Sequence, residues 1–218
     1  MRFRAENGLY LTARYAVTRI VGGMRSRLIA SSLGSPRRFW IGTDAVILGA
    51  ARISVGEGFV AGSHLWLEAI SVHHGVEYQP VIEIGKNVTL GDSVRIAANT
   101  RIRIGDDVLM GSKIYIADHN HGTYDDRAPS DPHESPHLRF LSSGDEVTVG
   151  NKAWIGESVT ILAGASVGEG SIIGANSVVT SSIPSFAIAA GSPARVIKQF
   201  DTTTKRWQRV NPTDDAGR

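Results

Sequence analysis

The sequence predicts an all-β fold, a parallel β-helix in which short strands stack in successive coils. The first observation is a six-residue period of aliphatic residues in the second half of the chain. The period runs through Val149, Ile155, Ile161, Val167, Ile173 and Val179. The second is glycine directly after four of these six residues, and the third is a total of 24 glycines against 8 prolines. Such a period is typical of solenoids, in which glycine relieves crowding at tight corners.

The same period occurs in the first half of the chain. Its aliphatic members there are Ile41, Ile47 and Ile53, then Ile84, Leu90 and Ile96, and then Ile104, Met110 and Ile116. A period of six fits neither the 3.6-residue repeat of a helix nor the two-residue alternation of a strand. A β-sandwich would show turn signals about every 8 to 12 residues without a fixed register, so we favour the solenoid. We expect it to cover residues 39–200.

The first 38 residues predict a helical cap that precedes the solenoid. Residues 7–43 contain six arginines and no acidic residue. On a helix, one broad face would gather Tyr10, Ala13, Val17, Ile20, Met24 and Leu28. Such a basic amphipathic helix suits either an anionic membrane surface or a cap over the open end of the first coil, and we favour the cap. We expect Gly22 and Gly23 to break the helix.

Two segments interrupt the six-residue period after similar stretches. RISVGEGFVAGSHLWL (52–67) parallels RIRIGDDVLMGSKIYI (101–116), and each is followed by a segment that contains histidines. The first interruption covers about residues 68–80 and the second residues 117–146. A loop as long as the second is usually functional or disordered. We expect Ile114 and Ile116 to belong to the core and the polar residues after them to leave the stack.

Composition and charge exclude several classes of protein. The 218 residues contain no cysteine, which rules out disulfide scaffolds, thiolate metal sites and cysteine nucleophiles. The net charge is only +2, and we expect no nucleic-acid partner. No stretch reaches the roughly 18 apolar residues of a membrane span, and arginines interrupt the most hydrophobic early segment, which disfavours a signal peptide. We expect a cytoplasmic location, with action at the inner face of the membrane left open.

The segment AWIGESVTILAGASVGEGSIIGANSVVTSSIPSFAIAAGSPARVIKQF (153–200) resembles the C-terminal half of the hexapeptide-repeat acetyltransferases. It fits their maltose/galactoside O-acetyltransferase-like branch, which includes polysaccharide and lipopolysaccharide O-acetyltransferases. The resemblance extends over about residues 41–200 and includes DHNHG (118–122). It implies a left-handed β-helix with three faces and about eighteen residues per turn. It also implies a homotrimer with active sites between subunits, and acetyl-CoA as the acyl donor.

Two histidines stand at the start of the second interruption. Acetyl transfer to a hydroxyl needs a base, and histidine suits that role because its pKa lies near neutrality. A gapless count from Gly105 sets His121 on the position of the catalytic histidine in the maltose acetyltransferase-like pattern. The resemblance therefore implies His121 as general base, with His119 as the second candidate. Asp118 could orient the imidazole, and the two loop aspartates (125–126) are open to the same role.

The resemblance also implies a coenzyme A site in the last coils. Its residues would be Trp154, Ala175, Thr180, Arg195 and Lys198. The first three would line the pantetheine groove, chiefly through backbone groups, and the two cations would face the phosphates of the nucleotide. The chain departs from the family pattern at two positions, Glu157 in place of a small residue and Ser181 in place of a lysine. The nucleotide then has one phosphate partner fewer.

The first interruption contains the adjacent histidines His73 and His74. In trimeric β-helices of the carbonic-anhydrase type, three histidines bind a metal between subunits, so metal-dependent hydration is an alternative. Adjacent residues of an extended segment point in opposite directions, however, and a coenzyme A signature has no role in hydration. We expect no metal site and interpret the pair as part of a solvated loop.

The C-terminal tail, residues 201–218, is expected to leave the solenoid. A turn at Asp201–Thr204 would bring Phe200 and Trp207 together in a small hairpin. The last residues, NPTDDAGR, have the composition of a disordered end.

The function expected from the sequence is an acetyl-CoA-dependent O-acetyltransferase. It would act by direct transfer on a sugar hydroxyl of a cell-surface polysaccharide precursor. An N-acetyltransferase acting on an amino sugar would use the same fold and donor, and a non-catalytic β-helix scaffold protein would keep the solenoid without turnover. The expected partners are a sugar or glycan acceptor and two further copies of the chain, with peripheral membrane contact through the basic N-terminal segment as another possibility.

Overall fold

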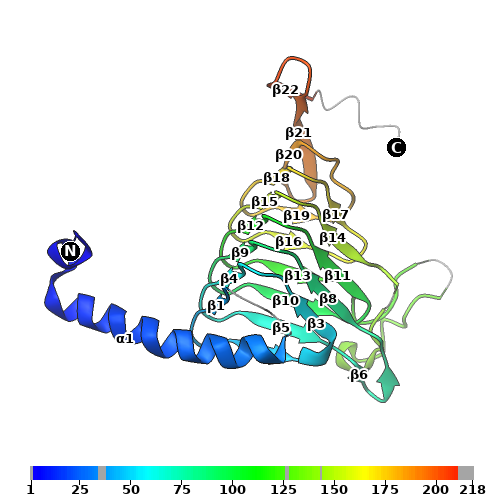
Figure 1. Cartoon of the computed structure of the whole chain (residues 1–218). Coiled ribbons are helices and arrows are strands. Elements are labelled where there is room, and N and C mark those ends of the chain that lie inside the picture. The colour runs from blue at the N-terminus through cyan, green and yellow to red at the C-terminus, as the bar shows by residue number, and fades with distance from the viewer. Residues whose placement is uncertain (1, 34–37, 126–127, 143, 211–218) are drawn as a thin grey trace.

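A computed structural model describes residues 2–33, 38–125, 128–142 and 144–210. The chain forms a β-helix with one long helix at its broad end and a hairpin at the other (Figure 1). Three predicted features lie outside the described residues: the end of the helical cap at 34–37, the loop aspartate at 126, and the disordered end at 211–218.

Three sheets of short strands form the three faces of the β-helix. Face A contains β1 (Trp40–Ile41), β4 (Val60–Ala61), β9 (Thr89–Leu90), β12 (Leu109–Met110), β15 (Trp154–Ile155), β18 (Ile172–Ile173) and β20 (Ala187–Gly191). Face B contains β2 (Val46–Leu48), β5 (Trp66–Ala69), β10 (Arg95–Ala98), β13 (Tyr115–Ala117), β16 (Thr160–Ile161) and β19 (Val178–Val179). Face C contains β3 (Ile53–Val55), which follows the short helix η1 (Ala50–Arg52), and then β8 (Val81–Ile84), β11 (Arg101–Ile104), β14 (Val147–Val149) and β17 (Ser166–Val167). The chain visits faces A, B and C in turn, and each strand pairs in parallel with the strand one coil away.

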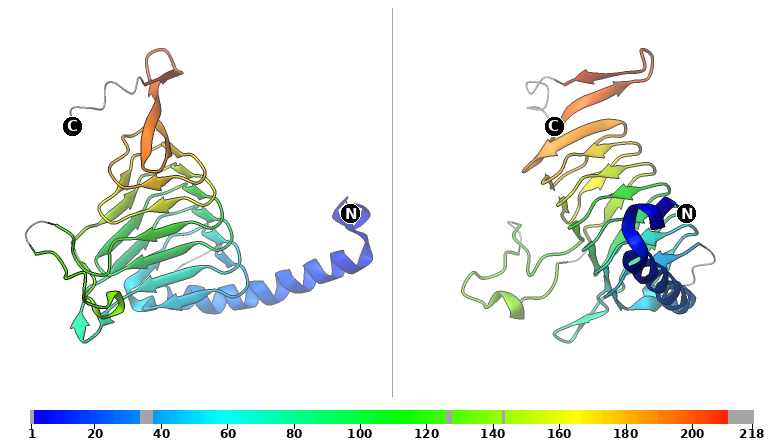
Figure 2. Two further views of the ribbon diagram at one scale, coloured as in Figure 1. Left: turned by 180° about the vertical axis from the view of Figure 1, so that it is seen from behind. Right: turned by 90° about the vertical axis from the view of Figure 1, so that its left-hand side faces the viewer.

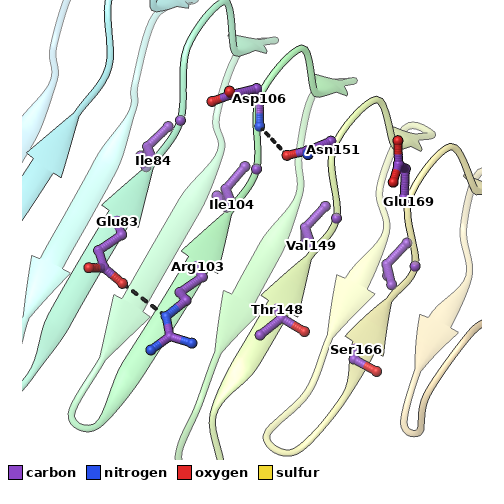
Figure 3. A pocket seen from close by; sticks show the side chains of 15 residues that line it. Glu83, Ile84, Arg103, Ile104, Asp106, Thr148, Val149, Asn151, Ser166 and Glu169 are labelled. Carbon is purple, nitrogen blue, oxygen red and sulfur yellow. Dashed lines mark hydrogen bonds and ion pairs between the residues drawn. The ribbon is translucent and has the colours of Figure 1, made fainter. Parts of the chain in front are cut away.

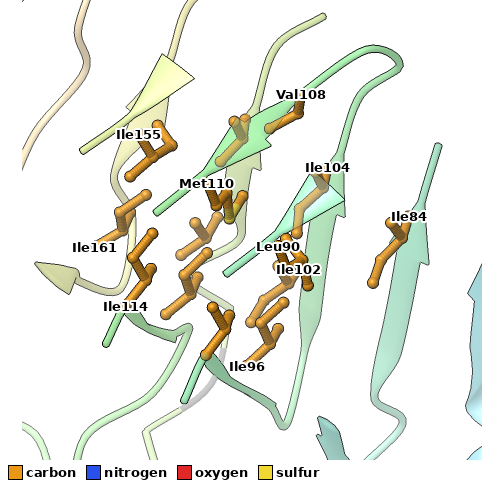
Figure 4. Close-up of a cluster of buried hydrophobic side chains, with 14 of the residues drawn as sticks. Ile84, Leu90, Ile96, Ile102, Ile104, Val108, Met110, Ile114, Ile155 and Ile161 are labelled. Atoms are coloured by element: carbon orange, nitrogen blue, oxygen red, sulfur yellow. The ribbon is translucent and has the colours of Figure 1, made fainter. Parts of the chain in front are cut away.

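The core is a stack of aliphatic side chains enclosed by the three sheets (Figure 4). Ile155 lies in register with Ile173, and Ile161 with Val179. The six predicted aliphatic positions of the second half are all at most 2% exposed. Burying a side chain of this kind stabilises a fold by about 1.5 to 3 kcal/mol. The six-residue period is therefore confirmed as the inward column of each face.

Glycine at the corners lets successive coils approach each other. A Cβ atom on Gly156 would lie 2.7 Å from the backbone nitrogen of Ala175 and 2.8 Å from the carbonyl oxygen of Ile173, one coil further on. Neighbouring strands are only about 4.8 Å apart, so a corner pressed this closely against the next coil leaves no room for a side chain. The predicted role of glycine as relief from crowding holds at this corner.

The helix α1 (Arg2–Ser32) lies across the broad end of the β-helix and extends beyond it (Figures 1 and 2). Its C-terminal half packs on β1. The Ser26 hydroxyl accepts a hydrogen bond from the backbone N–H of Ile41 at 3.1 Å, and Leu33, just past the helix, is 3% exposed within the core. No helix in the described part of the chain is long and apolar enough to cross a membrane.

The predicted break of this helix at Gly22 and Gly23 is wrong. The helix continues through both residues, and its one kink lies at Gly8, where φ is 72° and ψ is 174°. A Cβ on Gly22 would lie 2.6 Å from the Trp40 ring. The tertiary contact with this ring explains why a residue with poor helix propensity stands inside the helix.

The C-terminal hairpin is confirmed. Strand β21 (Ala194–Asp201) pairs antiparallel with β20 and with β22 (Arg206–Arg209). The rings of Phe200 and Trp207 lie 5.3 Å apart between centroids. The Asp201 carboxylate accepts hydrogen bonds from the backbone N–H groups of two turn residues, at 2.8 and 3.0 Å, and these bonds lower its pKa.

Candidate active site

Both interruptions of the repeat leave the β-helix at the same corner, where the chain passes from face B to face C. We call this the B–C corner. The first interruption follows β5 and the second follows β13, and both strands flank β10 in face B. The first, whose histidine pair was interpreted as part of a solvated loop, forms a short antiparallel hairpin of β6 (Val72–His73) and β7 (Val76–Glu77). Among its described residues, the second contains only the short helix η2 (Pro136–Leu138) and an isolated bridge between His121 and Leu141.

Hydrogen bonds at two places join the interruptions. The Tyr78 hydroxyl donates a hydrogen bond to the Leu141 carbonyl at 3.2 Å and accepts one from the Leu141 N–H at 3.0 Å. The Nε2 atom of His74 lies 2.7 Å from the carbonyl oxygen of His137, so this nitrogen carries the proton. Segments more than sixty residues apart in sequence thus form one wall beside the B–C corner.

Asp118 is fully buried at the start of the second interruption. Its carboxylate accepts hydrogen bonds from the backbone N–H groups of Asn99 and Thr100, each at 2.9 Å, and lies 3.0 Å from Nδ1 of His119. The prediction that the polar residues after Ile116 leave the stack is therefore wrong for Asp118. The backbone donors of the preceding coil hold it in the stack, because a buried carboxylate needs hydrogen-bond partners.

The carboxylate of Asp118 orients His119 rather than His121. The side chain of His119 is only 9% exposed, and its Nδ1 is committed to the carboxylate. Asp125, the second predicted orienting group, accepts a hydrogen bond from the backbone N–H of Ala128 at 3.2 Å. Asp126 lies outside the described residues.

His121 is exposed at the B–C corner, beside the hairpin of the first interruption. Its ring centroid lies 5.4 Å from that of His73, and His73 in turn lies 4.4 Å from His74. Partial burial lowers the pKa of His121, and the charges of His73, His119 and His74 lower it further. The imidazole of His121 is therefore neutral near pH 7, the form that can accept a proton.

The loop after His121 is braced by Arg139. Its guanidinium donates hydrogen bonds to the Tyr124 hydroxyl at 3.0 Å and to the carbonyls of Asp131 and Glu134 at 3.0 and 2.7 Å. The Tyr124 hydroxyl in turn donates to the carbonyl of His121 at 2.6 Å. This chain of contacts fixes the backbone that carries His121.

The predicted coenzyme A residues lie on other parts of the β-helix. Trp154 is 51% exposed on face A, in register with Leu109 and Ile172. Ala175 is exposed in the turn between faces A and B, and Thr180 is exposed directly after β19. The two cations, Arg195 and Lys198, belong to β21. The structure thus brings an exposed apolar column and two cations to face A, and the histidines to the B–C corner.

Glu157, one of the two departures from the expected pattern, has a structural role. Its carboxylate accepts a hydrogen bond from the backbone N–H of Ser112 at 2.8 Å, across neighbouring coils. A small residue would leave this corner N–H without that partner.

A shallow trough of about 610 Å³ on face C is a separate feature (Figure 3). Glu83 and Arg103 form an ion pair in it at 3.0 Å, and Ser166 lies along its floor. Residues 164–168 read G-x-S-x-G, but Ser166 belongs to strand β17 and not to the strand-to-helix turn of a serine nucleophile. None of the predicted catalytic or coenzyme A residues lines this trough.

Within the described ranges, no group of three histidine, aspartate or glutamate side chains is arranged to hold a metal ion. His73 and His74 instead take part in the wall around His121. The Nε2 atom of His73 is buried and has no hydrogen-bond partner among the described residues.

Several residues of this site were not predicted from the sequence. Tyr78, Asn99 and Arg139 hold the two interruptions and Asp118 in place. One sequence signal could have located the first of them. Segments 52–67 and 101–116 have the same sequence pattern and therefore occupy equivalent positions in their coils. The interruptions that follow them must leave the β-helix at the same corner.

Three comparisons with known proteins bear on this site. The family profile described as "Bacterial transferase hexapeptide (six repeats)" matches residues 146–181, the regular coils after the second interruption. The Escherichia coli (strain K12) protein named as lipopolysaccharide biosynthesis O-acetyl transferase WbbJ is 40% identical over 159 residues, which cover 72% of this chain and 77% of that protein. The galactoside O-acetyltransferase of the same strain is 31% identical over 147 residues, which cover 67% of this chain and 66% of that protein.

A solved structure shares the fold. AntD, an N-acyltransferase from Bacillus cereus in complex with dTDP and 3-hydroxybutyryl-CoA, superposes with a TM-score of 0.55 at 22% sequence identity. The match covers 83% of this chain and 90% of that one.

Proposed function

Because this chain belongs to the hexapeptide-repeat acetyltransferases, we propose that it transfers acetyl from acetyl-CoA to a hydroxyl of a sugar, with His121 as general base. The chain is an acyltransferase with the left-handed β-helix of that family. The acceptor that we propose is a precursor of a cell-surface polysaccharide, in keeping with the lipopolysaccharide O-acetyl transferase to which the chain is 40% identical.

One observation carries the choice of base. His121, in the second interruption, is exposed beside the hairpin of the first, and partial burial together with three neighbouring histidines keeps its pKa below the ordinary value. A neutral imidazole can remove the proton of a hydroxyl as the oxygen attacks the acyl carbon. His119 is less suited, because its ring is nearly buried and bonded to Asp118. We assign His119 and Asp118 to positioning the start of the loop.

The proposed transfer is a single displacement in which atoms and protons balance. The imidazole of His121 accepts the hydroxyl proton while the sugar oxygen bonds to the acetyl carbon and the carbon–sulfur bond breaks. The protonated imidazole then gives the same proton to the leaving thiolate. Holding acceptor and donor side by side supplies much of the rate, because it removes the entropy cost of their encounter.

The residues of face A fit a coenzyme A donor. Leu109, Trp154 and Ile172 form an outward apolar column that suits the pantetheine arm, and Leu109 and Trp154 are 47% and 51% exposed. Arg195 and Lys198 on β21 place positive charge where phosphates could bind. These features support Trp154, Arg195 and Lys198 as part of the donor site. The resemblance adds Ala175 and Thr180, which are exposed in the turn between faces A and B and directly after β19.

A homotrimer would complete the site. In one chain, Trp154 lies on face A while His121 lies at the corner between the other two faces. Packing the B–C corner of one subunit beside face A of the next would bring acceptor base and donor groove together. We therefore propose a trimer with active sites between subunits.

The location that suits these substrates is the cytoplasm, at the inner face of the membrane. Acetyl-CoA is a cytoplasmic metabolite, and precursors of surface glycans are commonly assembled on lipid carriers at that face.

The test is acetyl-CoA consumption with a panel of sugar nucleotides, glycans and amino sugars. His121→Ala should lower kcat by about 10² to 10⁴-fold, the usual contribution of a general base, without changing the thermal unfolding midpoint. His119→Ala should cost less in kcat and more in stability, because it leaves the buried carboxylate of Asp118 without one of its partners.

The outcomes distinguish the two candidate bases, the two types of acetyl transfer and a scaffold protein. Equal activity of His121→Ala and the native enzyme would refute the base assignment, and a larger loss in His119→Ala would transfer the role to His119. Turnover with amino sugars alone would indicate N-acetyl transfer. Neither turnover nor coenzyme A binding by the native protein would indicate a scaffold protein.

A further inference from the structure

The helix α1 exposes apolar side chains on more than one side, and Val17 and Val21 line a pocket of about 410 Å³ together with Trp40 of the first coil. One set of these side chains runs along a single face of the helix. Its members, which we call the outer stripe, are Tyr10, Val17, Ile20, Met24 and Leu28, and all are 60% to 73% exposed. The opposite side of the helix carries Gly22 and Ser26, which are buried against β1. The helical period of 3.6 residues separates these two sets. The contact with β1 is therefore made by Gly22 and Ser26 and not by the predicted apolar face, and Leu33 joins the core just past the helix.

An apolar stripe of this length indicates a binding surface. The N-terminal half of α1 extends beyond the β-helix, where no other part of the described chain covers it (Figures 1 and 2). An isolated helix is marginal in water, and contiguous exposed apolar side chains on a folded protein usually mark an interaction site.

The charges beside the outer stripe indicate an anionic partner. Arg14 and Arg27 are exposed and flank the stripe on its two sides, and residues 7–43 contain no acidic residue. Two other arginines of the helix are used within the fold. Arg25 donates a hydrogen bond to the carbonyl of Ile41 at 2.8 Å, and Arg19 stacks 4.3 Å from the centroid of the Trp40 ring.

We propose that the outer stripe docks on an anionic membrane surface, with α1 lying in the plane of the interface. The apolar residues would enter the boundary between headgroups and acyl chains, and Arg14 and Arg27 would reach the lipid phosphates at either side. Tyr10, at the outer end of the stripe, has the amphipathic ring that favours this boundary.

A second copy of the helix fits this surface less well. Two outer stripes packed together would bring Arg14 and Arg27 of both chains to the same contact, with no acidic residue in 7–43 to neutralise them. Like charges at an apolar contact oppose association. The membrane supplies the missing negative charge.

Docking in this way would orient the B–C corner relative to the membrane. The hairpin β6–β7 and the long loop lie toward the same broad end of the β-helix as α1 (Figures 1 and 2). An acceptor held on a lipid carrier would then be presented close to the B–C corner. Only this last consequence rests on the proposed function, because lipid binding can be measured without turnover.

The experiment is co-sedimentation of the full-length protein with vesicles. Native protein should bind vesicles of phosphatidylglycerol and phosphatidylcholine and should not bind vesicles of phosphatidylcholine alone. Val17→Ser/Ile20→Ser/Met24→Ser should weaken binding at least tenfold. Arg14→Gln/Arg27→Gln should weaken it roughly 25-fold, at about fivefold per arginine near an anionic surface, and should reduce its salt dependence.

A charge-matched control separates docking from net charge. Lys205→Gln/Arg206→Gln removes two exposed cations from the hairpin at the opposite end and should bind vesicles like the native protein. Equal loss in this control, or unchanged binding in the triple serine variant, would overturn the proposal. So would a fall in the molar mass of the triple variant by light scattering, which would identify the outer stripe as a contact between subunits.

Discussion

The regular coils from Val147 to Val179 and the B–C corner of the earlier coils are held together in different ways. In the regular coils, every sixth residue fills the same kind of position, and the register of one coil repeats in the next. At the B–C corner, single hydrogen bonds such as those of Tyr78 to Leu141 and of Asp118 to Asn99 fix segments that have no repeat. Stability therefore depends on many equivalent contacts in the first region, and geometry depends on a few unique ones in the second.

This difference explains where chemistry can be placed. A position in the regular stack is tied to its neighbours above and below, so its side chain is chosen by packing. An interruption leaves the stack and can present polar groups, but it must then be anchored by its own bonds. Six of the seven histidines lie in the second kind of region, and Tyr78, Asp118 and Arg139 are the anchors.

The largest expected effect comes from breaking the regular region. Ile161→Ala removes a side chain that is fully buried between Ile116 and Val179. We expect it to lower the free energy of unfolding by about 2 to 5 kcal/mol, because the rigid stack leaves a cavity. Chemical denaturation at fixed protein concentration measures this change.

The same variant should leave the B–C corner intact, so kcat per folded molecule should stay near the native value. The matched control is Thr160→Ala, the outward neighbour in the same strand, which should change stability much less. A loss of kcat as large as the loss of stability would show that the two regions are not separable.

A smaller effect is expected from loosening the corner. Tyr78→Phe keeps the ring but removes both hydrogen bonds to Leu141, and it leaves a buried N–H and carbonyl without that partner at a cost of about 1 to 3 kcal/mol. We expect kcat to fall several-fold, because His121 is bridged to Leu141.

Amide hydrogen exchange shows whether that effect is local. In Tyr78→Phe, amides of 118–142 should exchange faster while those of the regular coils keep their protection. Tyr115→Phe on face B is the control. Faster exchange throughout the β-helix would mean that the hydroxyl supports the whole fold and not the corner alone.

The smallest expected effect is a shift in the pKa of His121 at the B–C corner. The pKa of His121 lies below its ordinary value of 6.5, with burial as the main cause and the charge of His73 as the next. The charge of His73 opposes protonation of His121, so His73→Gln should raise the pKa of His121 and move the acid limb of kcat/KM to higher pH by a fraction of a unit. Initial rates across the acid range measure it.

His64→Gln serves as the control for that measurement, because His64 lies outside both interruptions and pairs with Asp44 at 3.7 Å. Its profile should match the native one. An acid limb that moves to lower pH in His73→Gln, or that does not move, would show that His73 does not act on the base through its charge.

The sequence alone predicted most of the fold. The positions of Ile155, Ile161 and their equivalents could be assigned to the core because a six-residue period allows only one inward direction for each strand. The helix break at Gly22 and Gly23 was predicted wrongly, because propensity could not show that Trp40 packs against Gly22. The departure of Asp118 from the stack was also predicted wrongly, since its partners come from another coil.

The candidate site could be predicted only in part. The resemblance and the count from Gly105 identified His121, His119 and Asp118 as candidates. They did not show that Asp118 bonds to His119 and that His73 stands beside His121. Both facts depend on the path that each interruption follows between leaving the β-helix and rejoining it.

The coils could be assigned from the sequence, because each residue's role in them follows from its place in a local period. Only the folded structure shows how the two interruptions meet, which histidine is bonded and which is exposed, and where the apolar side chains of α1 lie. The difference comes from distance along the chain. Tyr78 and Leu141, or Gly22 and Trp40, meet only after the coils have stacked, and no local pattern records a contact made by stacking.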